Sequence, residues 1–354
     1  MKVIKAIENQ GHEQLLFCQD SEIGLKAIIA IHNTVLGPSL GGTRMWNYES
    51  EEKALKDVLR LSRGMTLKAS IAGLDLGGGK AVIIGDPKKV KNEKVMRRFG
   101  QFVDSLGGKY ITAEDVNMSE REMEWISKET KHVTGLSEEL GGKGDPSPIT
   151  AYTTYLGMKA ATKHAFGDDS LTDKKIVVQG IGNVSRRLIA LLKKEKASIY
   201  VTDIDEEKVN QLTSKYSSVK VCDPEKIFSV DADIYAPCAL GGTVNPQSIQ
   251  EMNMKIIAGC ANNQLEDEER DGEACKKKGI VFAPDFLINS GGLINVYAEY
   301  KDFSRREVMM RAEKVYNNTL DILVKADKKD QHPQQVAIAE ARKRIEEAKK
   351  LRLN

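Results

Sequence analysis

Cysteine and histidine are scarce in this chain, and neither is spaced as a metal or disulfide motif. The 354 residues include five cysteines and five histidines, with no Cys-x-x-Cys pair and no His-x-x-x-His pair. A structural zinc site usually needs such close spacing, and a disulfide framework usually needs a denser set of cysteines. We therefore expect neither, and we expect no metal site in catalysis.

Excess charge and long apolar runs are also absent. The 53 Lys and Arg residues nearly balance the 51 Asp and Glu residues, for a net charge of +2. Such a balance gives no basic surface for nucleic acid or an anionic membrane. No run approaches the ~18 apolar residues of a spanning helix, and residues 1–10 carry charges where a signal peptide has an apolar core. We expect a cytoplasmic protein with no nucleic-acid or membrane partner.

The chain reads as a two-domain α/β protein. Apolar residues make up 41% and charged residues 29%, which is typical of a globular protein, and the length favours two domains. Periodicity predicts helices over 51–63, 93–105, 150–165, 183–194 and 334–353, and strands over 81–84, 110–112, 175–179 and 198–203. The strand–helix–strand alternation after residue 175 indicates a doubly wound parallel sheet. The Gly- and Pro-rich segment 141–148 is the candidate hinge or cleft-lining loop.

Residues 176–185 are typical of a turn that binds a dinucleotide. An apolar strand leads into Gly180, and Gly182 would let the backbone approach a pyrophosphate at the start of the next helix. Ser185 stands where a third Gly or Ala is usual, but it is small enough for close packing. Asp203 ends the next apolar strand about 20 residues on, where a carboxylate would bind ribose hydroxyls and repel a 2′-phosphate. The pattern predicts NAD rather than NADP; a plain glycine turn is the alternative.

Lys68 and Lys80 stand twelve residues apart, and Gly77–Gly79 directly precede Lys80. The three glycines remove side chains and would let a ligand reach Lys80, while the apolar residues beyond them would keep it dry. Desolvation and a second cation both lower the pKa of a lysine, as a general base requires. A phosphate-binding loop is excluded, because Leu74 and Ala81 stand where that motif needs Gly and Ser or Thr. We predict a functional Lys80, with a solvated surface lysine as the alternative.

Asp115 and the pair Gly41-Gly42 are further candidates. Asp115 follows a predicted strand and could carry a proton to a substrate nitrogen, but it could equally cap a helix. The backbone of Gly41 and Gly42 could bind a carboxylate, or the pair could be a simple turn.

With these motifs in view, the chain resembles the glutamate/leucine/phenylalanine/valine dehydrogenase family over nearly its whole length. The segments that carry the resemblance are 37–46, 73–80, 112–115, 144–148, 236–242, 261–265 and 284–292. The resemblance implies NAD-dependent oxidative deamination of an aliphatic L-amino acid, with L-leucine as the first candidate.

The same resemblance implies roles for the candidate residues. Lys68, helped by Gly41 and Gly42, would bind the substrate carboxylate. Lys80 would activate the water that attacks the iminium carbon formed by hydride transfer to NAD. Asp115 would exchange protons with the substrate nitrogen.

Further residues are implied to hold the cofactor and to orient the substrate. They are Gly180, Ile181, Gly182, Asn183, Val184, Ser185 and Arg186 around the pyrophosphate, Asp203 and Ile204 at the adenosine ribose, Thr150 and Asn262 at the nicotinamide, Cys238 and Ala239 in the same crevice, and Asn289 at the substrate.

The family's architecture implies domain boundaries and an assembly. A substrate-binding and oligomerisation domain would cover 1–133 plus 326–354, and a Rossmann-type NAD-binding domain would cover 134–325. The active site would lie in the cleft, whose closure would exclude water from the reaction. A homo-oligomer, often an octamer, is also implied.

Leu40 decides against glutamate as the substrate. Glutamate-specific members of the family carry a lysine directly before the Gly-Gly pair, and burying a glutamate carboxylate against Leu40 would cost several kcal/mol. An apolar pocket is therefore expected, with walls at Leu40, Ala113, Leu293 and Val296. Leu293 stands where leucine-specific members often carry a smaller valine, and one methylene is worth only ~1–3 kcal/mol. An aromatic amino acid dehydrogenase and a non-catalytic NAD-binding sensor are the alternatives.

Overall fold

The computed structural model describes residues 3–353, which form two compact units. Unit 1 holds the chain up to Gly144, Val296–Phe303 and the chain from Ala341 onward; unit 2 holds Asp145–Asn295 and Ser304–Glu340. The domain boundaries that the sequence suggested, 1–133 plus 326–354 and 134–325, stay a prediction. Within residues 3–353, no helix has the length and apolar character needed to cross a membrane.

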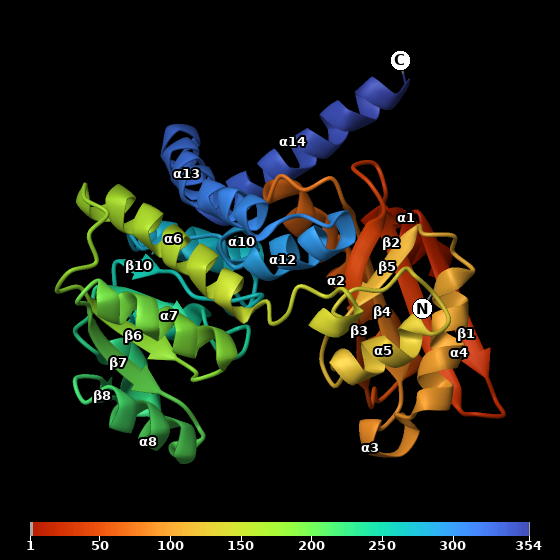
Figure 1. Cartoon of the computed structure of the whole chain (residues 1–354). Coiled ribbons are helices and arrows are strands. Elements are labelled where there is room, and N and C mark those ends of the chain that lie inside the picture. Colours follow the sequence, from red (N-terminus) through yellow and green to blue (C-terminus); the bar gives the residue numbers. More distant parts are fainter. Residues whose placement is uncertain (1–2, 354) are drawn as a thin grey trace. The chain divides into compact units, whose positions relative to one another are not determined.

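Unit 1 is built on a five-stranded mixed sheet, in the order β1-β2-β4-β3-β5 (Figure 1). Its strands are β1 Gln14–Asp20, β2 Leu25–Asn33, β3 Ser39–Trp46, β4 Gly77–Ile84 and β5 Tyr110–Ala113, and its helices are α1 Val3–Gln10, α2 Glu51–Ile71, α3 Pro87–Val90, α4 Glu93–Asp104 and α5 Glu120–Ser127, with the 3-10 turn η1 Glu138–Leu140. The first two strands and β4 pair antiparallel, whereas β3, β4 and β5 pair parallel. One apolar cluster lies between the sheet and α2, and another lies on the side of α4 and α5.

Helix α2 is longer than the sequence predicted. The side chain of Ser50 accepts a hydrogen bond from the Lys53 amide, and two glutamates follow, so the start of the helix is as expected. The helix continues past residue 63 because Ser62, Thr66 and Ser70, four residues apart, are buried and extend its inner face. These small polar residues made the face hard to recognise from hydrophobicity alone. The extension places Lys68 on a helix.

Unit 2 contains the predicted parallel doubly wound sheet, in the order β11-β10-β9-β6-β7-β8 (Figure 1). Its strands are β6 Lys175–Gln179, β7 Ser198–Thr202, β8 Lys220–Val221, β9 Ile234–Pro237, β10 Ile256–Ile257 and β11 Val281–Phe282, and its helices and 3-10 turn are α6 Ser147–Phe166, α7 Asn183–Lys194, α8 Glu206–Lys215, η2 Pro224–Ser229, α9 Pro246–Glu251, α10 Glu268–Lys277, α11 Asp285–Ile288 and α13 Arg305–Lys329. One apolar cluster joins the sheet to α6, α7 and α8, and another joins it to α9 and α10. The two-domain α/β fold expected from the sequence is confirmed.

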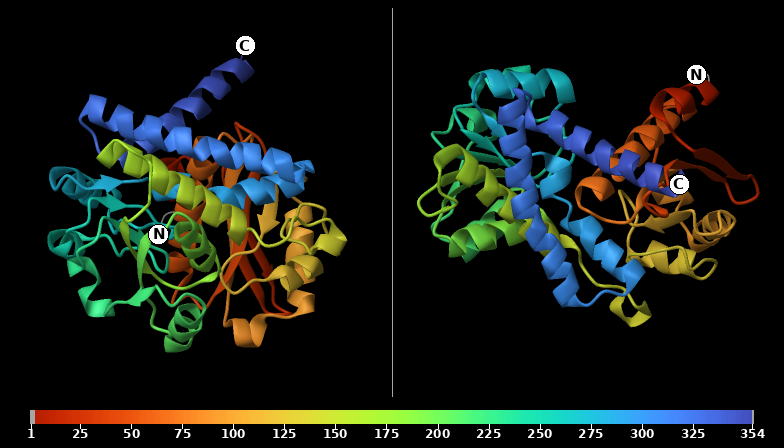
Figure 2. Two further views of the ribbon diagram at one scale, coloured as in Figure 1. Left: turned by 60° about the vertical axis from the view of Figure 1, so that its left-hand side comes forward. Right: turned by 90° about the horizontal axis from the view of Figure 1, so that it is seen from above.

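Three helices complete the chain around these cores. Helix α12 (Gly291–Lys301) begins in unit 2 and ends in unit 1, and α14 (Pro333–Leu353) does the same. Helix α13 lies along α6 (Figure 2). Helix α6 starts at Ser147, three residues before its predicted start, because a proline such as Pro148 is tolerated in the first turn of a helix.

Candidate active site

Lys80 and Asp115, which the sequence singled out separately, lie in contact. Lys80 is in the central strand β4, and its Nζ is 2.9 Å from Oδ2 of Asp115, in the loop after β5. The side chain of Lys80 is only 8% exposed. Asp115 does not cap the next helix, because Ser119 is the N-cap of α5. The helix-cap alternative for Asp115 is therefore excluded, and its proton-carrying role stays a prediction.

A second cation, Arg44, binds the same carboxylate oxygen. Its Nε lies 2.9 Å from Oδ2 of Asp115, and its Nη1 lies 3.1 Å from Oδ2 of Asp57 on α2. The hydroxyl of Tyr48 donates to that Asp57 oxygen at 2.7 Å. Arg44, Asp57 and Tyr48 are not among the residues predicted from the sequence. The available signal was an arginine inside the strand-like run that follows Gly42.

Burial lowers the pKa of Lys80, and the positive charge of Arg44 lowers it further. The carboxylates of Asp115 and Asp57 act in the opposite direction but do not cancel the effect of burial. Burial alone would raise the pKa of Asp115, but Lys80 and Arg44 outweigh it and hold that pKa below its usual range. The sequence predicted a second cation near Lys80 and named Lys68; the structure adds Arg44.

Strand register places four of the candidate side chains on one face of the sheet. Leu40 pairs with Gly78 and Arg44 pairs with Val82, so both share a face with Lys80, which lies between those two β4 residues. Ala113 pairs with Gly42 and joins the same face. This is the face covered by α2, which supplies Asp57. An apolar wall and the charged cluster are thus neighbours.

The glycines before Lys80 are packed against protein. A Cβ at Gly78 would lie 2.1 Å from the backbone nitrogen of Thr66, and one at Gly79 would lie 2.7 Å from the ring of Tyr110. A Cβ at Gly41 would lie 1.8 Å from the Gly79 carbonyl oxygen. The interpretation that these glycines leave room for a ligand is therefore wrong, because helix α2 and neighbouring strands fill that space.

The close approach of α2 also locates Lys68. Met65 packs against Gly41 and Thr66 packs against Gly78, and Lys68 follows two residues after Thr66 in the same helix. Lys68 comes eleven residues after Asp57, which is about three helical turns, so both project from nearly the same side of α2. Lys68 therefore projects from the same side of α2 as Asp57, and its role in binding the substrate carboxylate stays a prediction.

In unit 2, the turn after β6 has the shape expected for a dinucleotide. Gly180 has φ of +99°, and a Cβ there would lie 2.7 Å from Cβ of Ala239, in the loop after the neighbouring strand β9. A Cβ at Gly182, the N-cap of α7, would meet nothing within 4 Å. The turn thus leaves an exposed helix start without a capping side chain, at the point where strand order reverses.

Asp203 is fixed beside this turn. Its Oδ2 accepts a hydrogen bond from the Ile181 amide, and its Oδ1 accepts one from the Asp205 amide at 2.9 Å. Each carboxylate oxygen keeps a second lone pair for a ribose hydroxyl. Ile204 is 99% exposed beside it. These residues fit the adenosine end of NAD.

The other predicted cofactor residues differ in what they can offer. Ile181 and Ser185 are buried, so they present only backbone, and the Ser185 hydroxyl accepts from the Gly182 amide at 2.7 Å. Asn183 and Asn262 are exposed; Val184, Arg186, Thr150 and Cys238 are half-buried. Thr150 donates to the Pro146 carbonyl at 3.0 Å from the first turn of α6.

The side-chain oxygen of Asn289 lacks a hydrogen-bond donor among the described residues. Its Nδ2 donates to Oδ1 of Asn262 at 2.9 Å and to the Cys260 carbonyl at 3.2 Å, yet its Oδ1 is buried with no hydrogen bond. A buried acceptor left unpaired costs about 1–3 kcal/mol. This orphaned oxygen, next to Asn262, fits a ligand that carries a donor.

The predicted pocket residues on α12 lie one turn apart. Leu293 is 6% exposed and Val296 is half-buried, three residues further along the same helix. Among residues 3–353, no group of three or more His, Cys, Asp or Glu side chains could hold a metal ion.

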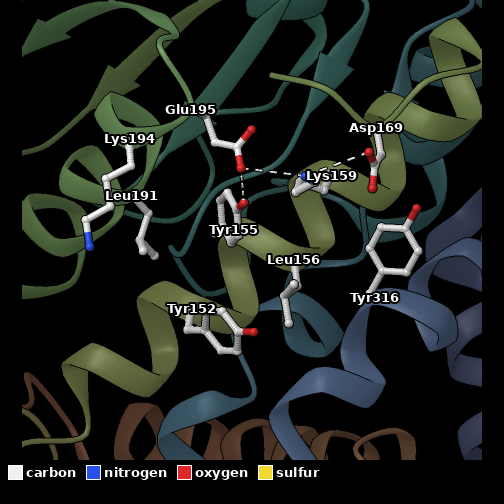
Figure 3. Close-up of a pocket in the computed structure, with 9 residues that line it drawn as sticks. All are labelled: Tyr152, Tyr155, Leu156, Lys159, Asp169, Leu191, Lys194, Glu195 and Tyr316. Atoms are coloured by element: carbon white, nitrogen blue, oxygen red, sulfur yellow. Dashed lines mark hydrogen bonds and ion pairs between the residues drawn. The ribbon is translucent and has the colours of Figure 1, made fainter. Parts of the chain in front are cut away.

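A separate cavity of about 550 Å³ lies elsewhere in unit 2 (Figure 3). Its lining residues are Tyr152, Tyr155, Leu156, Lys159, Asp169, Leu191, Lys194, Glu195 and Tyr316. Tyr155 donates to Glu195, whereas Lys159 lies 3.6 Å from Glu195 and 3.7 Å from Asp169. Glu195 ends α7, roughly 20 Å along its axis from Gly182 at ~1.5 Å per residue. This cavity is not part of the cofactor turn.

Comparison with known proteins identifies relatives across both units. Residues 12–132 match the family model described as Glu/Leu/Phe/Val dehydrogenase, dimerisation domain, and residues 200–352 match the one described as Glutamate/Leucine/Phenylalanine/Valine dehydrogenase. The chain is 52% identical to the leucine dehydrogenase of Geobacillus stearothermophilus, covering 99% of this chain and 95% of that one. It is 52% identical to the leucine dehydrogenase of Bacillus subtilis, covering 91% and 88%.

A solved structure agrees with the whole fold. The crystal structure of L-tryptophan dehydrogenase from Nostoc punctiforme superimposes with a TM-score of 0.87 at 41% identity, covering 98% of this chain and 99% of that one.

Proposed function

This chain belongs to the Glu/Leu/Phe/Val dehydrogenase family, and we propose that it catalyses the NAD-dependent oxidative deamination of L-leucine. The products are the 2-oxo acid, ammonia and NADH. The observation that carries the proposal is the contact of buried Lys80 with Asp115, on the sheet face that also bears Leu40. A non-catalytic NAD-binding sensor would have no use for this buried charged pair.

NAD, when bound, supplies the hydride acceptor. In unit 2, the exposed start of α7 at Gly182 would hold its pyrophosphate, and Asp203 would hold the adenosine ribose. Asn289 and Asn262 would contact the reacting end of the ligands through the orphaned Asn289 oxygen and its neighbour. Thr150, Cys238 and Ala239 keep the roles predicted for them.

In unit 1, the side chains would bind and deprotonate. Lys68 and the backbone of Gly41 and Gly42 would hold the substrate carboxylate. Once the α-carbon has lost its hydride, neutral Lys80 would take a proton from the water that attacks that carbon. Asp115 would exchange protons with the departing nitrogen, so that one water is consumed and ammonia leaves. The lowered pKa of Lys80 favours the neutral amine that a general base requires.

Leu40 supports an apolar substrate. It is buried, 2% exposed, and carries no charge, so it could not pair with the side-chain carboxylate of a glutamate substrate. Ala113, Leu293 and Val296 are proposed as the remaining walls. An aromatic substrate is the main competitor, and a survey of rates with Leu, Ile, Val, Met, Phe, Trp and Glu distinguishes them. Higher kcat/KM with Phe or Trp than with Leu would move the assignment to the aromatic class.

Substitution of Lys80 tests the mechanism. The purified protein with NAD and L-leucine at alkaline pH should produce NADH, measured by its absorbance. Lys80→Ala should lower kcat at least 100-fold, as expected for loss of a general base, and should leave NADH affinity unchanged. Lys128→Ala is the control, because Lys128 pairs with Glu93 on the surface of unit 1. Near-normal turnover by Lys80→Ala would show that the mechanism is wrong.

We also propose that the chain forms a homo-oligomer, with an octamer as the expected state, and acts in the cytoplasm. Light scattering coupled to gel filtration measures the mass of the assembly directly. A monomer near 39.2 kDa would contradict the proposed assembly.

A further inference from the structure

The charged cluster beside Lys80 continues beyond the two residues that the mechanism uses. Asp115 receives both Lys80 and Arg44 on one oxygen, Oδ2, at 2.9 Å each. Two donors on a single oxygen fix where the carboxylate sits more firmly than either would alone. The other Asp115 oxygen is left for the substrate nitrogen in the proposed mechanism.

Arg44 is itself held in place by an ion pair with Asp57. Its Nη1 contacts Oδ2 of Asp57 at 3.1 Å, and the Tyr48 hydroxyl donates to that same oxygen at 2.7 Å. Arg60 binds the other Asp57 oxygen at 3.2 Å from the exposed side of α2. Arg44 and Asp57 are only 22% and 17% exposed. Asp57 on α2 and Asp115 in the loop after β5 therefore hold the guanidinium from two sides.

We propose that Arg44 is a positioning residue, held by Asp57, which Tyr48 in turn hydrogen-bonds, and that it aims the Asp115 carboxylate and sets the charge environment in which Lys80 works. A guanidinium suits this task because its nitrogens lie in one rigid plane and reach two carboxylates at fixed directions. A lysine would supply the charge without the plane. The role rests on the proposed function, since it concerns the same reaction.

The charges of Arg44 and Asp57 shift the pKa of Lys80 in opposite directions. Arg44 favours the neutral form of Lys80, whereas Asp57 favours the ammonium form. Loss of the Arg44 charge therefore raises the pH at which Lys80 becomes a base, and loss of the Asp57 charge lowers it. Lys68, from the same side of α2, stays constant in both variants.

The test is the pH dependence of kcat for leucine oxidation in three variants. Arg44→Gln should move the ascending limb of the plot of kcat against pH to higher pH by about one unit. Asp57→Asn should move that limb to lower pH. Arg44→Lys should keep the limb near its original pH but lower kcat by roughly 10- to 100-fold, because the charge stays while the aim of Asp115 is lost. Local disorder would lower kcat without opposite shifts.

Arg98→Gln is the matched control. Arg98 also places Nε 2.9 Å from an aspartate Oδ2, that of Asp20, but on a different part of unit 1. Its loss should leave kcat and the pH limb unchanged. NADH affinity, measured by fluorescence titration, should be unchanged in every variant, because the predicted NAD-binding residues belong to unit 2.

The outcomes distinguish a failure of the positioning role of Arg44 from a failure of the proposed function. If the unsubstituted enzyme oxidises leucine and Arg44→Gln keeps its kcat and pH limb, the positioning role is overturned and the proposed function stands. Shifts in the same direction for Arg44→Gln and Asp57→Asn would also overturn the role. If the unsubstituted enzyme does not reduce NAD with any amino acid, the proposed function itself fails. Should Arg44→Gln not fold, Arg44→Lys and Asp57→Asn decide the question.

Discussion

The glycine-rich segments Gly77–Gly79 in unit 1 and Gly180–Gly182 in unit 2 look alike in sequence, but their glycines have different structural roles. In unit 1, Gly77–Gly79 are glycines because protein atoms occupy the positions where side chains would be. In unit 2, a side chain at Gly182 would meet nothing within 4 Å, and Gly180 is needed for its positive φ. The first segment packs a helix against a strand, and the second leaves a helix start open.

The difference teaches that a glycine cluster beside a functional residue is not by itself a ligand site. Close packing of α2 over Gly78 keeps Asp57 in contact with Arg44 on β3, so these glycines act through packing. The turn at Gly180 and Gly182 serves it directly, by exposing backbone donors.

Substitution at Gly78 should have the largest effect on stability. Gly78→Ala places a Cβ 2.1 Å from the Thr66 backbone nitrogen, so α2 must move. The free energy of unfolding should fall by about 3 kcal/mol, at the upper end for overpacking. Gly64→Ala is the control in the same helix, since nothing lies within 4 Å of its Cβ; it should be neutral or stabilising by about 1 kcal/mol. Urea unfolding measures both, and equal stability of the two variants would contradict the packing explanation.

As the pH falls, the stability of unit 1 should decrease before that of unit 2. His12 and His32 stack edge to face with ring centroids 4.7 Å apart, and burial lowers the pKa of each to about 4. Between pH 6.5 and 4 the unfolded chain binds protons that the folded pair does not, so the free energy of unfolding falls as pH falls. We expect a loss on the order of 3 kcal/mol for each histidine across this window.

Hydrogen exchange at pH 7 and pH 5 checks this expectation. Amides of α1 and α2 should lose protection at pH 5 relative to those of β6 and α7, which act as the internal reference. His32→Gln should flatten the dependence. Equal protection of unit 1 at both pH values would contradict the assignment.

The smallest effect is expected at Gly182. Gly182→Ala has room for its Cβ and an ordinary φ of −91°, so stability should change by less than about 1 kcal/mol. The added methyl would occupy the place where the pyrophosphate approaches, and Kd for NADH should rise roughly tenfold, or about 1.4 kcal/mol. Fluorescence titration gives the Kd, with Gly64→Ala as the control. An unchanged Kd would remove Gly182 from the cofactor site.

Local patterns in the sequence predicted five of the helices and four of the strands, but not β1, β2, β3 or α13. The strand at 175–179 and the helix at 183–194 have the predicted bounds, because their apolar periodicity is regular and glycines delimit them. Helix α2 was cut short because its last turns bury Ser62, Thr66 and Ser70 instead of large apolar residues.

Contacts between distant segments could not be predicted in the same way. Arg44 and Asp115 are 71 residues apart, and only the register of three strands brings them together. The histidines looked dispersed along the chain, yet His12 and His32 meet beneath α2. The glycine interpretation failed for the same reason, since the sequence does not say what packs against a glycine.

In unit 1, hydrogen bonds join α14 to the segment before β4, two parts of the chain that are synthesised far apart in time. Arg344, on α14, donates to the Leu74 carbonyl at 2.7 Å and lies 2.8 Å from Asp75, just before the strand of Lys80. Ser70 likewise donates to the Ala341 carbonyl at 2.7 Å. During synthesis the segment that leads to Lys80 emerges long before these partners, since Leu74 and Arg344 are 270 residues apart. A chain lacking α14 would therefore lose the hydrogen bonds that hold the segment leading to Lys80.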